Sequence, residues 1–202
     1  MKIENQKLNV EEAFTNFVYT IPDYQREYVW GEKEVNKLLE DIYEEYSKEK
    51  SAETEYFIGS IVVQRNGKEI EVIDGQQRLT TLFLCLCAFK KLLSHHKQYV
   101  DTIQKWLFST KMNDKGKIVE SYNLILMYED TSDLLRQILQ EEEIKQILRK
   151  SSKKIYEAYQ YILNYLKINL TDKSEEELIK FLGYLSIKVN FIQIETPSIS
   201  DA

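Results

Sequence analysis

The 202-residue chain contains little proline, glycine or cysteine, with 2, 6 and 2 residues respectively. This scarcity excludes collagen-like and long low-complexity segments. No apolar run approaches the roughly 18 residues that a membrane-spanning helix needs, and residues 1–14 lack the apolar core of a signal peptide. We therefore expect a cytoplasmic protein with no membrane partner. The chain is long enough for one large domain or two small ones.

The two cysteines and the net charge exclude further classes of protein. Cys85 and Cys87 are two residues apart in a helical pattern, so they point to different faces and suit neither a disulfide nor one shared metal ion. We expect them to be core residues in a reducing compartment. The formal net charge of −6 is unsuited to general polyanion binding. Any DNA contact must come from a local patch, from a longer protein or from a partner.

The first half of the chain alternates between helical and strand patterns. Asn9 and Glu12 have the spacing of a capping box for a helix over residues 10–16. Residues 17–21 resemble a strand that Pro22 stops. An apolar stripe with helical spacing begins after Glu32, and it consists of Val35, Leu38, Leu39, Ile42, Tyr43 and Tyr46.

The dipeptide Asn66-Gly67 separates two runs rich in β-forming residues, 57–65 and 68–73. This pattern predicts a hairpin with a two-residue type I′ turn. The corresponding register would place Gly59 opposite Asp74, next to the turn that follows the second strand. The apolar segment after that turn predicts a buried helix that ends near residues 90–96.

The second half is mainly helical in pattern, with helices expected over residues 99–108, 130–150, 155–166 and 178–186 and strands over 122–127 and 189–194. Ser174 and Glu177 suggest another capping box. Residues 109–117 resemble a linker. We predict two parts, residues 1–98 and residues 99–202.

The segment from Val72 to Thr81 carries the densest set of reactive side chains. A strand that enters a helix through Gly75 forms an anion site, because free N–H groups and the helix dipole point at the ligand. The carboxylate of Asp74 suits Mg²⁺ or a water molecule. The amides of Gln76 and Gln77 suit a nucleophilic water or a phosphate, and Arg78 offers a planar fork for phosphate oxygens.

The hydroxyls of Thr80 and Thr81 lie in the predicted first helical turn and suit the same site. Together these residues have the components of phosphoryl transfer: charge stabilisation, water positioning and a metal ligand. The simpler alternative is that Asp74 is an N-cap and Arg78 a surface cation. We accept that alternative for either residue alone but not for the whole segment.

A second polar loop, residues 24–30, combines Tyr24, Gln25 and Arg26 with further aromatic residues. This mixture suits stacking on a base and binding of a phosphate. Alternatively, Tyr28 and Trp30 are core anchors beneath the loop, and for Trp30 both interpretations remain open.

Two other polar groups favour structural roles. His95 and His96 are adjacent on an expected helix and would point in different directions, so a metal role is the minor alternative. The basic residues of segment 149–154 suit a solvated junction between helices better than a phosphate site.

Three blocks of the sequence, residues 21–30, 56–61 and 72–82, resemble the signature blocks of the DGQQR-motif domain. That domain forms the N-terminal half of GmrSD-type, modification-dependent (type IV) restriction enzymes and of related phage-defence proteins. The resemblance implies an α/β (α+β) fold. It further implies a ParB/sulfiredoxin-like small mixed sheet, with a hairpin and a buried helix, followed by a mainly helical subdomain.

The resemblance also implies binding and hydrolysis of an NTP, with ATP, GTP, CTP and UTP all left open, together with Mg²⁺ held by Asp74. The implied catalytic residues are Asp74, Gln76, Gln77 and Arg78. The implied nucleotide-binding residues are Tyr24, Gln25, Arg26, Trp30, Gly59, Ser60, Gly75, Thr80 and Thr81.

The family continues into a further motif and a nuclease domain beyond the point where this chain ends. We therefore expect either a chain truncated at its C-terminal end or a standalone remnant of the longer protein. Nuclease activity is expected only in a longer protein or a partner, and the chain could also form homo-oligomers. The alternatives are a non-catalytic DNA-binding or interaction module and a ParB-like nicking nuclease. The nuclease would need a second carboxylate near Asp74, for which Glu27 and Glu71 are weak candidates.

Overall fold

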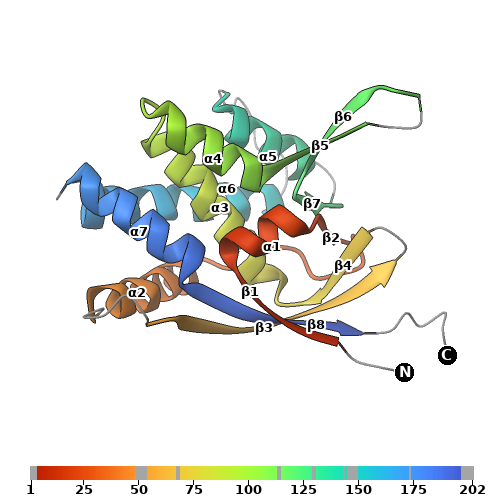
Figure 1. Cartoon of the computed structure of the whole chain (residues 1–202), viewed down its shortest axis with the longest axis horizontal. Helices are drawn as coiled ribbons and strands as arrows, with labels where there is room; N and C mark the ends of the chain where they lie inside the picture. The colour runs from red at the N-terminus through yellow and green to blue at the C-terminus, as the bar shows by residue number, and fades with distance from the viewer. Residues whose placement is uncertain are drawn as a thin grey trace.

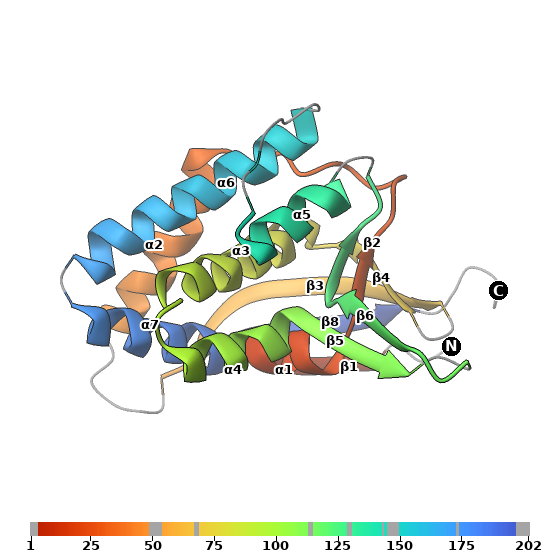
Figure 2. The same ribbon diagram turned by 90° about the horizontal axis from the view of Figure 1, so that it is seen from above.

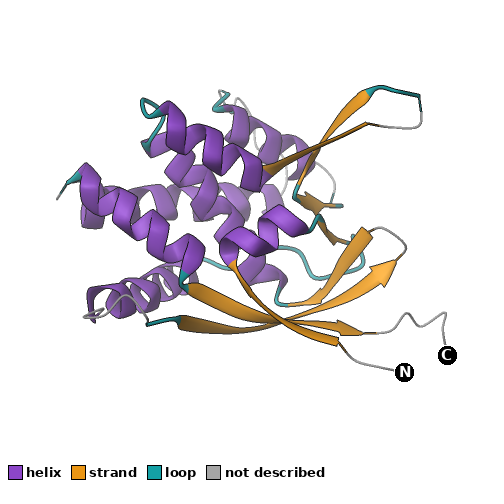
Figure 3. Cartoon of the chain, in the orientation of Figure 1, coloured by secondary structure: helices purple, strands orange, loops and turns teal. Residues whose placement is uncertain are grey.

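The computed structural model describes residues 4–48, 54–66, 69–112, 115–128, 131–142, 144, 150–172 and 174–196. Helices pack on a mixed six-stranded sheet, which confirms the expected α+β class. Figure 3 shows most of the strands in the lower part of the molecule and most of the helices above them, with a separate two-stranded ribbon projecting at the upper right.

The sheet joins strands from both ends of the chain. Its order is β1 (Glu4–Asn9), β8 (Val189–Thr196), β3 (Tyr56–Asn66), β4 (Glu69–Asp74), β2 (Tyr19–Ile21) and β7 (Leu124–Leu126). The β1–β8 and β3–β4 pairs are antiparallel, whereas β8–β3, β4–β2 and β2–β7 are parallel. The two predicted parts share this sheet, and their division at residue 98 stays a prediction.

One buried helix, α3, occupies the centre of the helical layer (Figure 2). It covers Gln76–Leu92, is buried continuously from Leu79 to Phe89, and packs against α4 and α6. The other helices are α1 (Val10–Asn16), α2 (Glu32–Lys48), α4 (Lys97–Leu107), α5 (Thr131–Gln140), α6 (Lys150–Leu166) with the π-helical turn Lys167–Thr171, and α7 (Glu175–Ile187) (Figure 1).

Local signals at the helix starts are confirmed. Asn9 Oδ1 accepts a hydrogen bond from Glu12 N at 2.8 Å, and Glu12 Oε2 accepts one from Asn9 N at 3.0 Å. These two bonds complete the capping box of α1. Ser174 Oγ likewise accepts from Glu177 N at 3.0 Å and caps α7. The thiols of Cys85 and Cys87 are buried and unpaired, as expected, and burial raises the pKa of both.

The linker predicted over residues 109–117 is wrong. Residues 109–112 instead belong to the strand β5 (Phe108–Met112), and residues 115–117 lie in the turn before β6 (Ile118–Tyr122). The two strands form an antiparallel ribbon that projects from the helical layer (Figure 1). The rings of Phe108 and Tyr122 pack edge to face at 4.7 Å between centroids. The sequence gives no apolar alternation here because much of this ribbon faces solvent.

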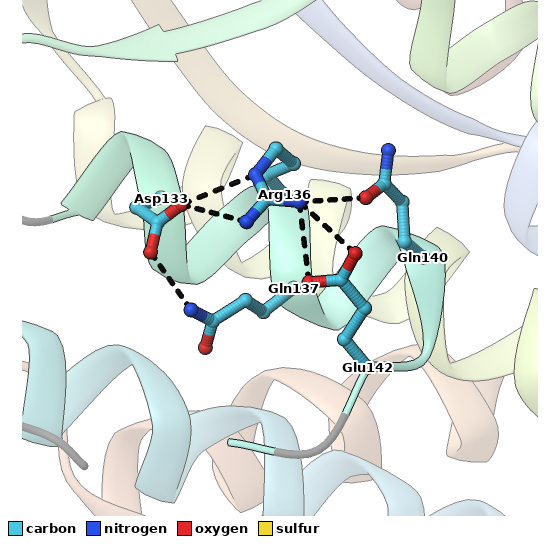
Figure 4. Close-up of polar contacts among 5 residues, drawn as sticks. All are labelled: Asp133, Arg136, Gln137, Gln140 and Glu142. Carbon is cyan, nitrogen blue, oxygen red and sulfur yellow. Dashed lines mark hydrogen bonds and ion pairs between the residues drawn. The ribbon is translucent and has the colours of Figure 1, made fainter. Parts of the chain in front are cut away.

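The helix predicted over residues 130–150 is described only in part. The helix α5 ends at Gln140, and Glu141 follows with φ +56°. Figure 4 shows Arg136 donating hydrogen bonds to Asp133, Gln140 and Glu142, which fastens the last turn of the helix to the residues after it. Residues 143 and 145–149 lie outside the described part of the chain.

The hairpin forms, but its predicted register is wrong by two residues. Asn66 pairs with Glu69, so the loop positions are residues 67 and 68, which lie outside the described residues. A β-bulge at Val62/Val63 shifts the pairing again, so that Val62 and not Gly59 faces Asp74. A bulge is a local insertion that a turn dipeptide cannot predict.

Candidate functional site

The strand-to-helix turn exists as predicted. β4 ends at Asp74, Gly75 has φ +87°, and α3 begins at Gln76 with no side-chain cap. A Cβ on Gly75 would lie 2.9 Å from Ile61 Cγ1 and 3.2 Å from Ser60 O, so glycine is required by both conformation and space. The start of α3 thus has no side-chain cap, which is the arrangement in which a helix N-terminus can receive an anion.

Two glutamines of the turn fasten the loop of residues 24–30 to α3. Gln77 Oε1 accepts hydrogen bonds from the backbone N–H of Val29 at 2.9 Å and of Trp30 at 3.3 Å. Gln77 Nε2 donates to Glu27 O at 3.1 Å, and Gln76 Nε2 donates to Arg26 O at 2.6 Å. Both amides thus position the loop. Gln76 Oε1 is buried and has no hydrogen-bond partner among the described residues.

Tyr28 anchors the loop from below. Its hydroxyl lies 2.8 Å from Thr81 Oγ1, which also donates to Gln77 O at 2.8 Å. The Tyr28 side chain is buried, and burial raises the pKa of its hydroxyl. The interpretation as a core anchor is therefore confirmed for Tyr28. Trp30 is half-buried and packs against the core.

Arg78 is held by the backbone of β3. Its Nη1 donates to Ile58 O at 2.6 Å, at an irregularity in the β3–β8 pairing between Phe57 and Ser60. Gly59 lies at this irregularity with φ +106°, and a Cβ there would lie 2.2 Å from Arg78 Nη1. Gly59 thus contributes to the turn through Arg78, not through Asp74.

The predicted site residues differ in exposure. The exposed ones are Tyr24, Arg26 and Asp74. The half-buried ones are Gln25, Trp30, Gly59, Ser60, Gln77 and Arg78, and the buried ones are Gly75, Gln76, Thr80 and Thr81. The Tyr24 hydroxyl donates to Glu71 Oε2 at 3.1 Å. The side chains that can meet a ligand directly are thus concentrated on Asp74 and on the start of the second loop.

The same loop forms one wall of a pocket of about 290 Å³ at the start of α6. Lys150, Lys154 and Ser151 line its other wall. The Ser151 hydroxyl is buried and has no hydrogen-bond partner among the described residues. Part of the basic segment 149–154 therefore lies beside the loop that Gln77 holds.

The turn alone offers few ligands for a Mg²⁺ ion. Asp74 offers one exposed carboxylate. Because Asp74 pairs with Val62 and Glu71 pairs with Gln64 across the bulge, the two carboxylates lie on the same face of the sheet. Among the described residues, no group of three potential metal ligands includes Asp74. Mg²⁺ is commonly held by one or two carboxylates together with substrate phosphates and water. The residues present fit an ion that arrives with a nucleotide.

Sequence reasoning missed Tyr128, whose hydroxyl donates to Arg26 O at 2.7 Å. The same carbonyl accepts the bond from Gln76, so two elements distant in sequence fix one peptide of the loop. Burial raises the pKa of Tyr128 to about 12. No local pattern could reveal this contact, because it joins residues 102 positions apart.

These features define an α+β domain with an uncapped helix N-terminus behind a glycine turn, and with a neighbouring loop that Gln76 and Gln77 of this helix hold in place. The family model described as GmrSD restriction endonuclease, N-terminal domain, matches residues 5–202. The chain therefore belongs to this family of restriction-enzyme domains, and the match includes the second half, where the signature blocks are absent. No curated protein matches the chain. None of the described helices is long and apolar enough to cross a membrane.

Proposed function

We propose that this domain binds a nucleoside triphosphate at the Asp74–Arg78 turn and hydrolyses it, as the regulatory part of a modification-dependent restriction protein in phage defence. The supporting observation is the uncapped N-terminus of α3, where Gly75 leaves N–H groups pointing out of a 17-residue helix. Such groups and the helix dipole favour phosphate.

The loop of residues 24–30 supplies the proposed contacts around the phosphates. Arg26 is exposed, and its own carbonyl is fixed by Gln76 and Tyr128, so its guanidinium starts from a defined backbone position. Tyr24 is 68% exposed and offers an aromatic face for a base. Lys150 and Lys154 line a pocket together with residues 27–29 of this loop and add positive charge beside it.

Hydrolysis needs a positioned water and stabilisation of charge on the transferred phosphoryl group. In the proposed site Gln76 Oε1, an acceptor without a partner among the described residues, orients the water. Asp74 holds the Mg²⁺ that the nucleotide brings, and this ion neutralises phosphate charge. The ParB/sulfiredoxin-like relationship and a cytoplasmic location belong to the same proposal.

The test compares Asp74→Asn and Arg26→Ala with the parent chain. Thermal shifts with ATP, GTP, CTP and UTP, each with and without Mg²⁺, report binding, and phosphate release reports turnover. We expect both variants to lose most of the shift, while Asp101→Asn, an exposed carboxylate on α4, keeps it. Binding that is equal in all four proteins would refute the proposal.

A non-catalytic DNA-binding module is the second candidate, because the same uncapped helix end can hold a backbone phosphate. It predicts salt-dependent DNA binding without phosphate release. A nicking nuclease is disfavoured, since no described carboxylate joins Asp74 in a group of three metal ligands. Metal-dependent nicking of supercoiled DNA that Asp74→Asn abolishes would favour the nuclease over the DNA-binding module.

A further inference from the structure

His95, His96 and Glu175 lie together at the end of the molecule where α3 passes into α4 and α7 begins. The helix α3 ends at Leu92, and His96 is the residue before α4, so both histidines belong to a turn. The expectation that they sit on a helix and diverge is therefore wrong. A turn lets adjacent side chains point the same way.

Both imidazoles face one carboxylate. His95 Nε2 lies 2.6 Å from Glu175 Oε2, and His96 Nε2 contacts Glu175 Oε1. The two rings are 4.3 Å apart between centroids. The potential ligand atoms of all three residues lie within 4.8 Å of one another.

The backbone fixes both sides of this cluster. Leu93, which precedes the histidines, is fully buried, and its carbonyl accepts a hydrogen bond from His96 N at 2.8 Å. His96 O in turn accepts from Tyr99 N at 3.0 Å. Glu175 is the first residue of α7, directly after the capping residue Ser174. The three ligands thus come from element ends that are already positioned.

We infer that His95, His96 and Glu175 form a binding site for a divalent transition metal of the zinc class. Zinc takes histidine nitrogen at about 2.0–2.1 Å and carboxylate oxygen at about 2.0–2.2 Å, and two histidines with one glutamate are an established ligand set. Tetrahedral geometry at these bond lengths separates ligand atoms by roughly 3.4 Å. The observed spacing requires only small side-chain adjustments to reach it.

The exposure of the cluster fits this inference. The side chains of His95, Glu175 and His96 are 60%, 43% and 34% exposed, so a metal ion can enter and keep a water or an outside group as its fourth ligand. An exposed ion pair contributes little to stability. An ion pair with Glu175 also needs only one of the two imidazoles, whereas a metal site uses both. Binding would tie the α3–α4 turn to the start of α7.

The experiment uses the chelator-treated chain without a polyhistidine tag, titrated with Zn²⁺ by calorimetry and with Co²⁺ by visible absorption. We expect one ion per chain and a tetrahedral Co²⁺ spectrum. His96→Ala and Glu175→Gln should each weaken Zn²⁺ binding by more than about 100-fold, because loss of a group that only hydrogen-bonds to a metal ligand already costs about 10–100-fold. Two variants are compared so that a folding defect in one of them does not decide the result.

Glu176→Gln is the matched control, since it removes the neighbouring exposed carboxylate of the same helical turn and should leave affinity unchanged. The site would be disproved by failure of the parent chain to bind Zn²⁺, or by equal binding in Glu175→Gln and Glu176→Gln. Neither result bears on the nucleotide proposal, because Asp74 and Arg26 take no part in this cluster.

Discussion

Replacing Gly59 by alanine tests whether Arg78 belongs to the framework of the turn. Two costs are expected. A side chain at φ +106° costs about 1–2 kcal/mol. The new Cβ would also lie 2.2 Å from Arg78 Nη1, so the guanidinium must move and give up its bond to Ile58 O, which is worth about 1.5–3 kcal/mol. The sum is a loss of about 2.5–5 kcal/mol of unfolding free energy.

The two costs separate in a double-mutant cycle. When Arg78→Ala is already present, Gly59→Ala meets no guanidinium and should cost only its backbone share. The expected coupling is therefore about 1.5–3 kcal/mol. Gly116→Ala is the control, because Gly116 has φ +70° but no atom within 4 Å of the added Cβ, and its cost should be the same in both backgrounds.

The assay is urea unfolding followed by circular dichroism and tryptophan fluorescence, whose transitions must coincide for a two-state analysis. An equal cost of Gly59→Ala with and without Arg78 would show that the guanidinium does not occupy this position. Arg78 would then be released from the framework and available as a phosphate ligand. A large coupling would leave the proposed phosphate contacts mainly to the N–H groups of α3 and to Arg26.

Three further outcomes are expected. Gln77→Ala should cost about 1–3 kcal/mol and speed hydrogen exchange of the loop amides, because three hydrogen bonds disappear; exchange unchanged relative to the exposed control Gln98→Ala would contradict this. The raised pKa of Tyr128 favours its neutral form in the folded state, so this contribution to stability is complete below pH 10 and is lost as pH rises towards about 12. Urea unfolding should show a smaller alkaline decline in Tyr128→Phe. Cys85 and Cys87 should react with a thiol reagent only at the rate of unfolding, and fast labelling of the native chain would refute their burial.

The parts of the fold that depend on residues close together in the sequence could be predicted from the sequence. The capping box of Asn9 and Glu12 and the periodic stripe of α2 involve residues three or four positions apart, and both are confirmed. The polar strand β1 was not predicted. Its register depends on β8, and all of its first four positions are polar and exposed, so they carry no apolar signal that would distinguish the strand from a loop. The predicted hairpin register was wrong first at the turn, where Asn66 pairs with Glu69, and a bulge at Val62/Val63 then shifted it again.

The candidate site shows the same division between local and distant information. The glycine turn and the group of polar side chains could be recognised directly. The sequence does not distinguish a side chain that stabilises the fold from one that binds a ligand. Gln77 and Arg78 have the chemistry of phosphate ligands. The Gln77 amide, however, hydrogen-bonds to backbone atoms 47–50 positions away, and Arg78 Nη1 donates to a carbonyl 20 positions away. Only the tertiary structure brings those partners within reach.

The position of β8 between β1 and β3 has a consequence for how the chain acquires its structure. On the ribosome, the chain emerges from its N-terminus at about 5–20 residues per second. β1 and β3 leave the ribosome well before β8, and neither can gain its β8 hydrogen bonds until residues 189–196 appear. During that interval, two strand edges and the apolar residues beneath them lack their native cover, which favours aggregation. We therefore expect synthesis rate and chaperone supply to influence the yield of this domain.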